Sequence, residues 1–455
     1  MSLISRAISK IEGPLIYLAP IPKIKNNEIV QIKKPSGQTT LGRCVIVSET
    51  SIVIEAFGGT DGLDMDNTQI KFSGDVLKIP VSEDMLNRIF NGLGHPIDNG
   101  PDIIPEASYD VNGEPINPFA REYPRDLIET GLSSIDTLTS LVCGQKLPIF
   151  SGYGLPHDEL AARIVNYAKI YKNVNEAPFL IVFVGIGIKH DTSLYFQSAF
   201  NKTNSNIIMF NNLASDPTIE RLLTPRIALT TAEFFAFTKG YQVLVILTDM
   251  TNYCEALREI SASKDEIPAR KGYPGYMYSD LASIYERAGR IKGQKGSITQ
   301  IPILTMPNDD INNPVPDLTG YITEGQIVLN HGLFGRDISP PMDILSSLSR
   351  IMKDAIVGKT REDHGDVMNQ LYTAYSKALD VRALQSIVGG EGLTPLDKKY
   401  MAFADKFEST FLSQPFETRY TFDESLDHAW TILSILPKSE LIRIKESYIE
   451  KYYKD

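Results

Sequence analysis

The stretch "FSGYGLPHDELAARI" (150–164) has the layout of a phosphate-binding loop without the residues that such a loop uses. An apolar run at 146–150 leads into a glycine turn formed by Gly152 and Gly154. An amphipathic helix is expected next, because apolar residues recur at four-residue intervals from Leu160. This order of strand, loop and helix indicates a nucleotide-binding type of α/β domain.

Each key position of the phosphate-binding pattern G-x-x-x-x-G-K-[ST] is altered here. Ser151 stands at the first glycine position, and Pro156, which lacks an N–H donor, stands at the second. His157 replaces the lysine and is mostly neutral near pH 7. Asp158 replaces the Mg²⁺-binding hydroxyl with a carboxylate, which suits the positive end of a helix and can satisfy its free N–H donors. On the loop alone, a simple capped helix start remains an open alternative.

Composition indicates a soluble globular chain with about three domains. The 455 residues are 42% apolar and 22% charged, and the net charge of −11 disfavours nucleic acid as a partner. Cys44, Cys143 and Cys254 form no CxxC pair and fit a reducing compartment. No apolar run reaches ~18 residues. The expected localisation is cytoplasmic, with any membrane association made through partners.

The chain divides into three zones of different pattern, and together they predict an α/β protein. Residues 1–75 carry short β-patterned runs and predict a small antiparallel barrel or sandwich. Residues 76–350 alternate apolar runs with helical stretches and predict a parallel sheet covered on both faces. Residues 351–455 carry helical spacing. The expected strands are 14–18, 28–33, 43–48, 51–57, 178–187, 206–210, 242–249 and 297–304, and the expected C-terminal helices are 364–384 and 439–453.

Two further positions fit a nucleotide-binding domain that has lost its catalytic groups. Asp249 ends the apolar run 242–249 in the manner of a Walker-B aspartate, although strand-end aspartates are common. Ile188 follows a Gly-x-Gly turn at the place where a catalytic carboxylate would stand. The tetrapeptide "VGKT" (357–360) is interpreted as an accidental match, because no strand precedes it and Lys353 stands at the first glycine position.

A set of motifs along the chain resembles the non-catalytic B subunit of the archaeal/vacuolar-type rotary ATPase/ATP synthase. The similarity runs from Ile11 to about Tyr452, with Tyr153 and Met342 as minor departures. The motifs are "GPLIYL" (13–18), "GLGHPIDNGP" (92–101), "FSGYGLPHDELA" (150–161), "LTDMTNYCEALREIS" (247–261), "GYPGYMYSDLASIYERAGR" (272–290), "ITQIPILTMPNDD" (298–310), "PDLTGYITEGQI" (316–327) and "PPMDILSSLSR" (340–350).

This resemblance implies an N-terminal β-barrel, a central RecA-like domain and a C-terminal helical domain. It also implies a ring of three A and three B subunits that surrounds a central stalk and is held by peripheral stalks. ATP or ADP with Mg²⁺ would be bound by the catalytic A subunit at an A–B interface, while the loop of this chain is silenced. The coupling ion, H⁺ or Na⁺, would then be a property of the membrane ring rather than of this chain.

By the same resemblance, Arg350 matches the arginine finger that is supplied to the neighbouring A subunit. A structural salt bridge is the ordinary alternative for such a residue. Arg287 and Arg290, at i and i+3 on an expected helix, are interpreted as structural or interface residues. The Gly/Pro-rich segment 265–277 resembles the loop that faces the stalk, with a plain solvated loop as the equal alternative. Trp430 is expected in the core, and the six histidines show no metal spacing.

Three classes of function remain on the sequence. The first is a non-catalytic subunit of a rotary motor that couples ATP synthesis or hydrolysis to ion transport. The second is an autonomous ATPase with a variant loop, which the replacements at His157 and Asp158 disfavour. The third is a hexameric RNA translocase of related fold, which the acidic composition disfavours.

Overall fold

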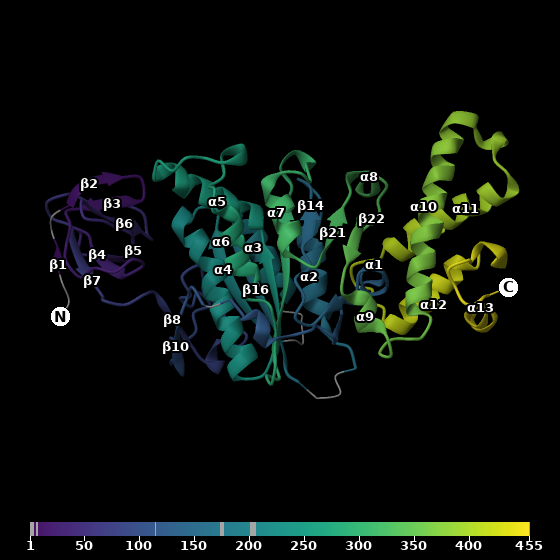
Figure 1. Cartoon of the computed structure of the whole chain (residues 1–455), viewed down its shortest axis with the longest axis horizontal. Helices are drawn as coiled ribbons and strands as arrows, with labels where there is room; N and C mark the ends of the chain where they lie inside the picture. The colour runs from purple at the N-terminus through teal and green to yellow at the C-terminus, as the bar shows by residue number, and fades with distance from the viewer. Residues whose placement is uncertain (1–3, 6–7, 114, 173–176, 201–205, 455) are drawn as a thin grey trace. The chain divides into compact units, whose positions relative to one another are not determined.

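The computed structural model describes residues 4–5, 8–113, 115–172, 177–200 and 206–454 (Figure 1). The chain forms two compact units, and each is described by itself. The first unit comprises Met1–Asn117, Leu180–Tyr195 and Asn206–Arg287. The second unit comprises Pro118–Phe179, Phe196–Ser205 and Ala288–Asp455.

The N-terminal part of the first unit is an antiparallel β-barrel, as the sequence predicts. Its strand order is β1-β7-β4-β5-β6-β3-β2, and every pair is antiparallel. Side chains from β2 to β7 meet in one apolar core that includes Ile16, Val30, Ile54 and Phe72. The strands are β1 (Ile4–Ser5), β2 (Ile8–Glu12), β3 (Leu15–Leu18), β4 (Ile29–Lys33), β5 (Thr39–Val47), β6 (Ile52–Ala56) and β7 (Gln69–Phe72).

The rest of the first unit carries parallel strands between helices, which confirms the predicted α/β pattern. β16 (Phe179–Ile188) pairs in parallel with β17 (Asn206–Leu213), and β17 pairs in parallel with β9 (Ile89–Asn91). β18 (Gln242–Thr248) lies on the other side of β16 and is buried throughout. Such uniform burial requires cover on both faces. The helices are α3 (His190–Phe200), α4 (Thr218–Glu233), α5 (Met250–Ser263) and α6 (Met277–Tyr285), and β8 (Lys78–Val81) pairs with β10 (Ala107–Asp110).

The helix expected over Arg287 and Arg290 is wrong. Helix α6 ends at Tyr285, and Gly289, with φ of 146°, begins strand β19 (Gly289–Ile291). Arg287 is 0% exposed and donates to the Glu233 carboxylate at 2.6 and 2.7 Å. The structural interpretation of this arginine is confirmed, because a buried guanidinium needs such a partner. Arg290, in the second unit, pairs with Asp126.

In the second unit, β14 (Ile149–Ser151) lies between β20 (Ser297–Thr305) and β21 (Gly325–Leu329) and is parallel to both. β22 (Met342–Ser349) closes this edge antiparallel to β21, and the sequence patterns did not predict it. The surrounding elements are β11 (Arg121–Glu122), β12 (Leu127–Glu129), β13 (Leu141–Val142), β15 (Lys169–Ile170), α1 (Ser133–Leu138), α2 (His157–Tyr167), α7 (Pro314–Ile322), α8 (His331–Phe334) and α9 (Met352–Ile356).

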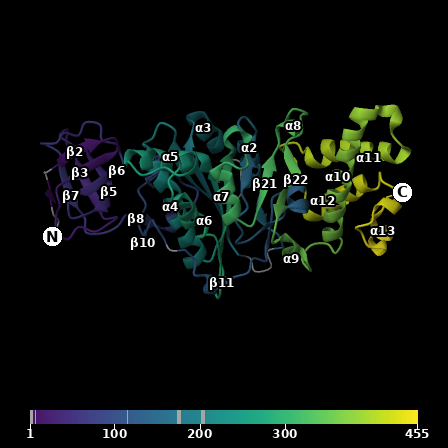
Figure 2. The same ribbon diagram turned by 45° about the horizontal axis from the view of Figure 1, so that its top comes forward.

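The C-terminal part of the second unit is helical, as predicted, and Figure 2 shows its helices packed together. Trp430 is 1% exposed, and its indole N–H donates to Asp363 Oδ2 at 2.6 Å, so the expected core position is confirmed. Buried Glu408 accepts hydrogen bonds from Arg336, Arg382 and Tyr375. The elements are α10 (His364–Val388), α11 (Pro395–Lys406), the π-helical turn Phe407–Leu412, α12 (Phe422–Leu433) and α13 (Glu446–Tyr452).

Candidate functional site

The altered loop lies at the carboxyl end of β14, in the strand–loop–helix setting that its sequence predicts. Ser151 ends the strand and is buried, whereas Tyr153 at the tip is 84% exposed. Gly154 has φ of +82°, a conformation that favours glycine. Helix α2 begins at His157. In parallel sheets, ligands bind at the carboxyl ends of the strands, so the loop is placed where a nucleotide-binding domain holds phosphate.

The polar groups of the loop are engaged with one another. His157 Nδ1 lies 3.0 Å from Ser151 Oγ, and His157 Nε2 lies 3.6 Å from Asp158 Oδ1. The imidazole is therefore held between a serine and a carboxylate of its own loop. The N-cap of α2 is Pro156, which makes no side-chain capping hydrogen bond, so the N-cap position is not filled by Asp158. Asp158 instead lies in the first turn, where its charge suits the helix dipole.

Two residues that the sequence reasoning missed close the space beside Gly152. A Cβ placed on Gly152 would lie 2.2 Å from Asp309 Oδ1 and 2.5 Å from His331 Nε2. These two side chains lie 3.3 Å apart. Asp309 follows β20 and His331 follows β21, so both reach the loop from the neighbouring parallel strands. The available signal was a polar residue soon after each apolar strand.

Mg-ATP does not fit these residues. Phosphate binding at such a loop relies on N–H donors and a lysine, with a hydroxyl for the metal. Here Pro156 offers no N–H, and the carboxylates of Asp158 and Asp309 stand at the loop instead. No group of three His, Cys, Asp or Glu suited to a metal ion occurs among the described residues.

The other two predicted positions belong to the first unit. Asp249 directly follows β18, as expected, and caps helix α5 by accepting from the Thr251 N–H at 2.8 Å. Ile188 ends β16 and is 6% exposed, so an apolar side chain occupies this strand end. The segment 265–277 joins α5 to α6 as a loop, and its Ile267 is 91% exposed.

Arg350 directly follows β22. It lies at the amino-terminal end of β21, whereas the loop lies beside the carboxyl-terminal end of that strand. Its N–H donates to Glu324 O at 2.9 Å, just before β21 begins, whereas the loop meets residues that follow the end of β21. Strand β21 has five residues, which span roughly 16 Å at the usual rise. Figure 1 accordingly shows α8 and α9 at opposite ends of β21 and β22. Arg350 is therefore kept away from the chain's own loop.

The Arg350 side chain is exposed, and its Nη1 donates a long hydrogen bond of 3.4 Å to Thr323 O. Glu324, whose backbone carbonyl accepts the Arg350 N–H, pairs its carboxylate with Lys146 Nζ at 2.8 Å instead. Among the residues that the structure describes, no carboxylate pairs with Arg350. The salt-bridge alternative therefore has no support in those residues. Lys359 of the "VGKT" segment, in contrast, pairs with Asp126 at 2.9 Å, as suits an accidental match.

Comparison with known proteins identifies the family. A V-type ATP synthase beta chain 2 of Clostridium tetani is 54% identical over 450 residues, covering 98% of this chain and 98% of that protein. The chain belongs to the V-type ATP synthase beta-chain family. A V-type ATP synthase beta chain of Thermotoga neapolitana is 53% identical over 450 residues, covering 98% of this chain and 97% of the relative.

Three domain families match successive parts of this beta-chain family member. They are the ATP synthase alpha/beta family beta-barrel domain (8–74), its nucleotide-binding domain (131–349) and the C-terminal domain of V and A type ATP synthase (353–453). Among solved structures, the ATP synthase subunit NeqB from Nanoarcheaum equitans superposes with a TM-score of 0.73 at 39% identity, covering 92% of this chain and 98% of that one. No helix in the described part of this chain is long and apolar enough to cross a membrane.

Proposed function

We propose that this chain is the non-catalytic B subunit of an A/V-type rotary ATP synthase/ATPase. Three copies would alternate with three catalytic A subunits, each supplying Arg350 to Mg-bound ATP or ADP at an A–B interface. The observation that carries the proposal is the separation of Arg350 from the loop by the length of β21. An exposed arginine that cannot reach its own loop suits a site on a neighbouring chain.

The loop supports the non-catalytic role, because the polar side chains at the loop already contact groups of the same chain. His157 contacts Ser151, and Asp309 fills the space at Gly152. A triphosphate would have to displace these groups and approach two carboxylates. Ile188 offers no carboxylate to orient an attacking water, a contribution of roughly 10²–10⁴-fold in general-base catalysis.

Arg350 suits the chemistry that the proposal assigns to it. Phosphoryl transfer spreads negative charge over the γ-phosphate oxygens, and a planar guanidinium can meet two of them. The backbone of Arg350 is held by Glu324 O, while its side chain stays exposed and keeps its charge available. Stabilisation of a transition state across an interface requires a positioned backbone and an accessible guanidinium, and Arg350 has both.

The proposal extends to partners outside the ring. The exposed loop 265–277, with Ile267 at its surface, is the segment we assign to the central stalk. Peripheral stalk subunits would hold the ring, and membrane association would come through the complex. An autonomous hexameric ATPase or an RNA translocase is the alternative function.

The test compares the isolated chain with the chain mixed with its catalytic partner. Calorimetric titration of the isolated chain with Mg-ATP should show weak or no binding, and hydrolysis should be absent until the A subunit is added. Poly-C should not bind, because the net charge is −11. Micromolar ATP binding that disappears in His157→Ala, or turnover by the isolated chain, would favour the autonomous ATPase instead.

A further inference from the structure

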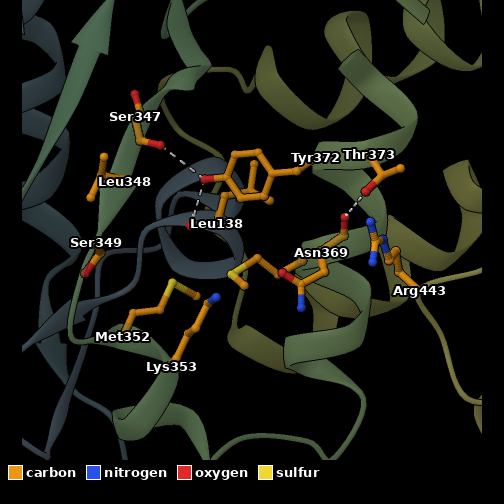
Figure 3. Close-up of a pocket in the computed structure, with 11 residues that line it drawn as sticks. Leu138, Ser347, Leu348, Ser349, Met352, Lys353, Asn369, Tyr372, Thr373 and Arg443 are labelled. Carbon is orange, nitrogen blue, oxygen red and sulfur yellow. Dashed lines mark hydrogen bonds between the residues drawn. The ribbon is translucent and has the colours of Figure 1, made fainter. Parts of the chain in front are cut away.

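A pocket of about 500 Å³ lies within the second unit, between the C-terminal helices and the end of β22 (Figure 3). This volume falls within the usual range for small-molecule sites, about 300–1,000 Å³. We call it the Tyr372 pocket. It is lined by Leu138, Ser347, Leu348, Ser349, Met352, Lys353, Met368, Asn369, Tyr372, Thr373 and Arg443.

The walls of the Tyr372 pocket are fixed by contacts within the chain. The Tyr372 hydroxyl lies 3.1 Å from Leu138 O and 3.4 Å from Ser347 O, so the ring is held across the pocket (Figure 3). Met352 and Met368 are buried and supply thioethers beside it. Aromatic rings and thioethers favour contact with a flat apolar body. The pocket therefore has a preformed surface for an aromatic group.

Two cations face this pocket from different elements. Lys353 extends from α9 toward the middle of the pocket, and Arg443 lies across from it beside Asn369 and Thr373 (Figure 3). The backbone of each is anchored, since Met352 is buried beside Lys353 and the Arg443 N–H donates to Gln370 Oε1 at 2.9 Å. The two charges are thus mounted on ordered backbone.

Neither cation is neutralised by the described part of the chain. No carboxylate lines the pocket, and no described residue forms an ion pair with Lys353 or Arg443. Three acids close in sequence to the pocket residues have other partners. Asp354 accepts from the Tyr123 hydroxyl, Asp366 accepts from the Lys445 N–H, and Glu440 pairs with Lys377. Two like charges on one concave surface without a counter-charge indicate an anionic occupant.

We propose that the Tyr372 pocket binds a small molecule with an anionic head group, phosphate or carboxylate, on an aromatic body. The head would pair with Lys353 and Arg443, and the body would pack on Tyr372, Met352 and Met368. This site is distinct from the loop at Gly152, and its lining residues Ser349 and Met352 flank Arg350 in the sequence. Its test uses the isolated full-length chain and does not depend on the proposed function.

The three probes share a phenyl ring and differ in the polar group attached to it. Phenyl phosphate and phenylacetate carry the two candidate anions, and benzyl alcohol is the neutral control. Binding is followed by saturation-transfer NMR and titration. We expect dissociation constants on the order of 1 mM for at least one anion, as suits ligands of this size. The stronger of the two anions identifies the head group, and added salt should weaken it selectively.

The variant Lys353→Gln/Arg443→Gln should weaken anion binding by about tenfold or more. Its matched control, Lys398→Gln/Arg419→Gln, removes two exposed cations outside the pocket and should bind like the unaltered chain. Both variants change exposed side chains, and thermal unfolding will verify that each folds. Absence of saturable anion binding, equal binding by the two variants, or equal binding of benzyl alcohol would overturn the proposal.

Discussion

The loop at 151–158 and the arginine at the end of β22 show opposite uses of polar groups. In the loop, His157 contacts Ser151 and Asp158, and Asp309 and His331 close in on Gly152. At Arg350, the backbone is anchored but the charged head has no carboxylate among the described residues. The polar side chains of the loop have partners within the chain, whereas the Arg350 guanidinium can still pair with an anion.

The same difference distinguishes a structural arginine, Arg287, from Arg350, for which we propose a role in catalysis. Arg287 is buried and meets Glu233 through two hydrogen bonds. Arg350 is exposed, and no carboxylate in the described part of the chain pairs with it. Removing the first should damage folding, and removing the second should damage a reaction on another chain. The predictions below test that division, from the largest expected effect to the smallest.

Arg350→Ala should lower single-turnover ATP hydrolysis by roughly 10³- to 10⁵-fold in rings reconstituted with the catalytic subunit. Lysine should rescue poorly, because a point charge does not reproduce the bidentate contact. Hexamer mass is measured first, and Arg419→Ala serves as the exposed-arginine control. Near-normal turnover from intact Arg350→Ala rings would end the finger assignment. Failure of this variant to assemble would assign Arg350 to the interface instead.

Arg287→Met should destabilise the chain by about 3–5 kcal/mol, because it leaves the Glu233 carboxylate without its buried partner. Thermal unfolding followed by circular dichroism measures the change. Replacing both residues, as Arg287→Met/Glu233→Leu, should recover part of the loss. An Arg287→Met protein as stable as the unaltered chain would show that this pair carries no folding role, and would weaken the contrast with Arg350.

A buried histidine of the second unit extends the comparison to pH. His364 is buried, its Nε2 lies 2.9 Å from Thr137 O, and burial lowers its pKa to about 4. Since this folded-state pKa lies below the unfolded value near 6.5, the stability is complete above pH 6.5 and is lost as pH falls toward 4. The full loss attributable to His364, reached below pH 4, should be on the order of 3 kcal/mol, and about 2 kcal/mol of it should have developed by pH 5.

Urea unfolding followed by the fluorescence of Trp430, the single tryptophan, measures this loss at pH 7.5 and 5. His364→Gln removes the titration of this buried imidazole and should flatten the difference. An equal pH dependence in His364→Gln and the unaltered chain would remove His364 as the cause.

Restoring Gly, Lys and Thr at Pro156, His157 and Asp158 should have the smallest effect. One restored lysine should raise Mg-ATP affinity by about tenfold, since a hydrogen bond to a charged group contributes about 1.5–3 kcal/mol. Turnover should stay absent, because Ile188 still offers no carboxylate. Adding Asp309→Asn removes the acid beside Gly152 and should raise affinity again. Hydrolysis by the isolated triple variant would show that the loop alone had silenced the site.

Local patterns in the sequence were sufficient for several features of this chain. Apolar runs predicted β3 to β6 of the barrel and β14, β16, β17, β18 and β20 of the parallel sheet. Helical spacing predicted α10 and, within the range 439–453, the shorter α13, but it missed α11 and α12. The loop replacements at Pro156, His157 and Asp158 were visible directly, because the phosphate-binding pattern is contiguous in the chain. The predicted domain boundaries at 75 and 350 stay predictions, as do the roles of Arg350 and Asp249.

Other features were decided only by tertiary contacts between residues far apart in the sequence. Helix α6 ends at Tyr285, and Arg287 is buried against Glu233, 54 positions earlier. Asp309 and His331 reach Gly152 because β20 and β21 flank β14 in parallel. Whether a charge such as that of Arg350 is neutralised likewise depends on which strands become neighbours. Periodicity reports which face of an element is buried, but strand order determines which side chains meet.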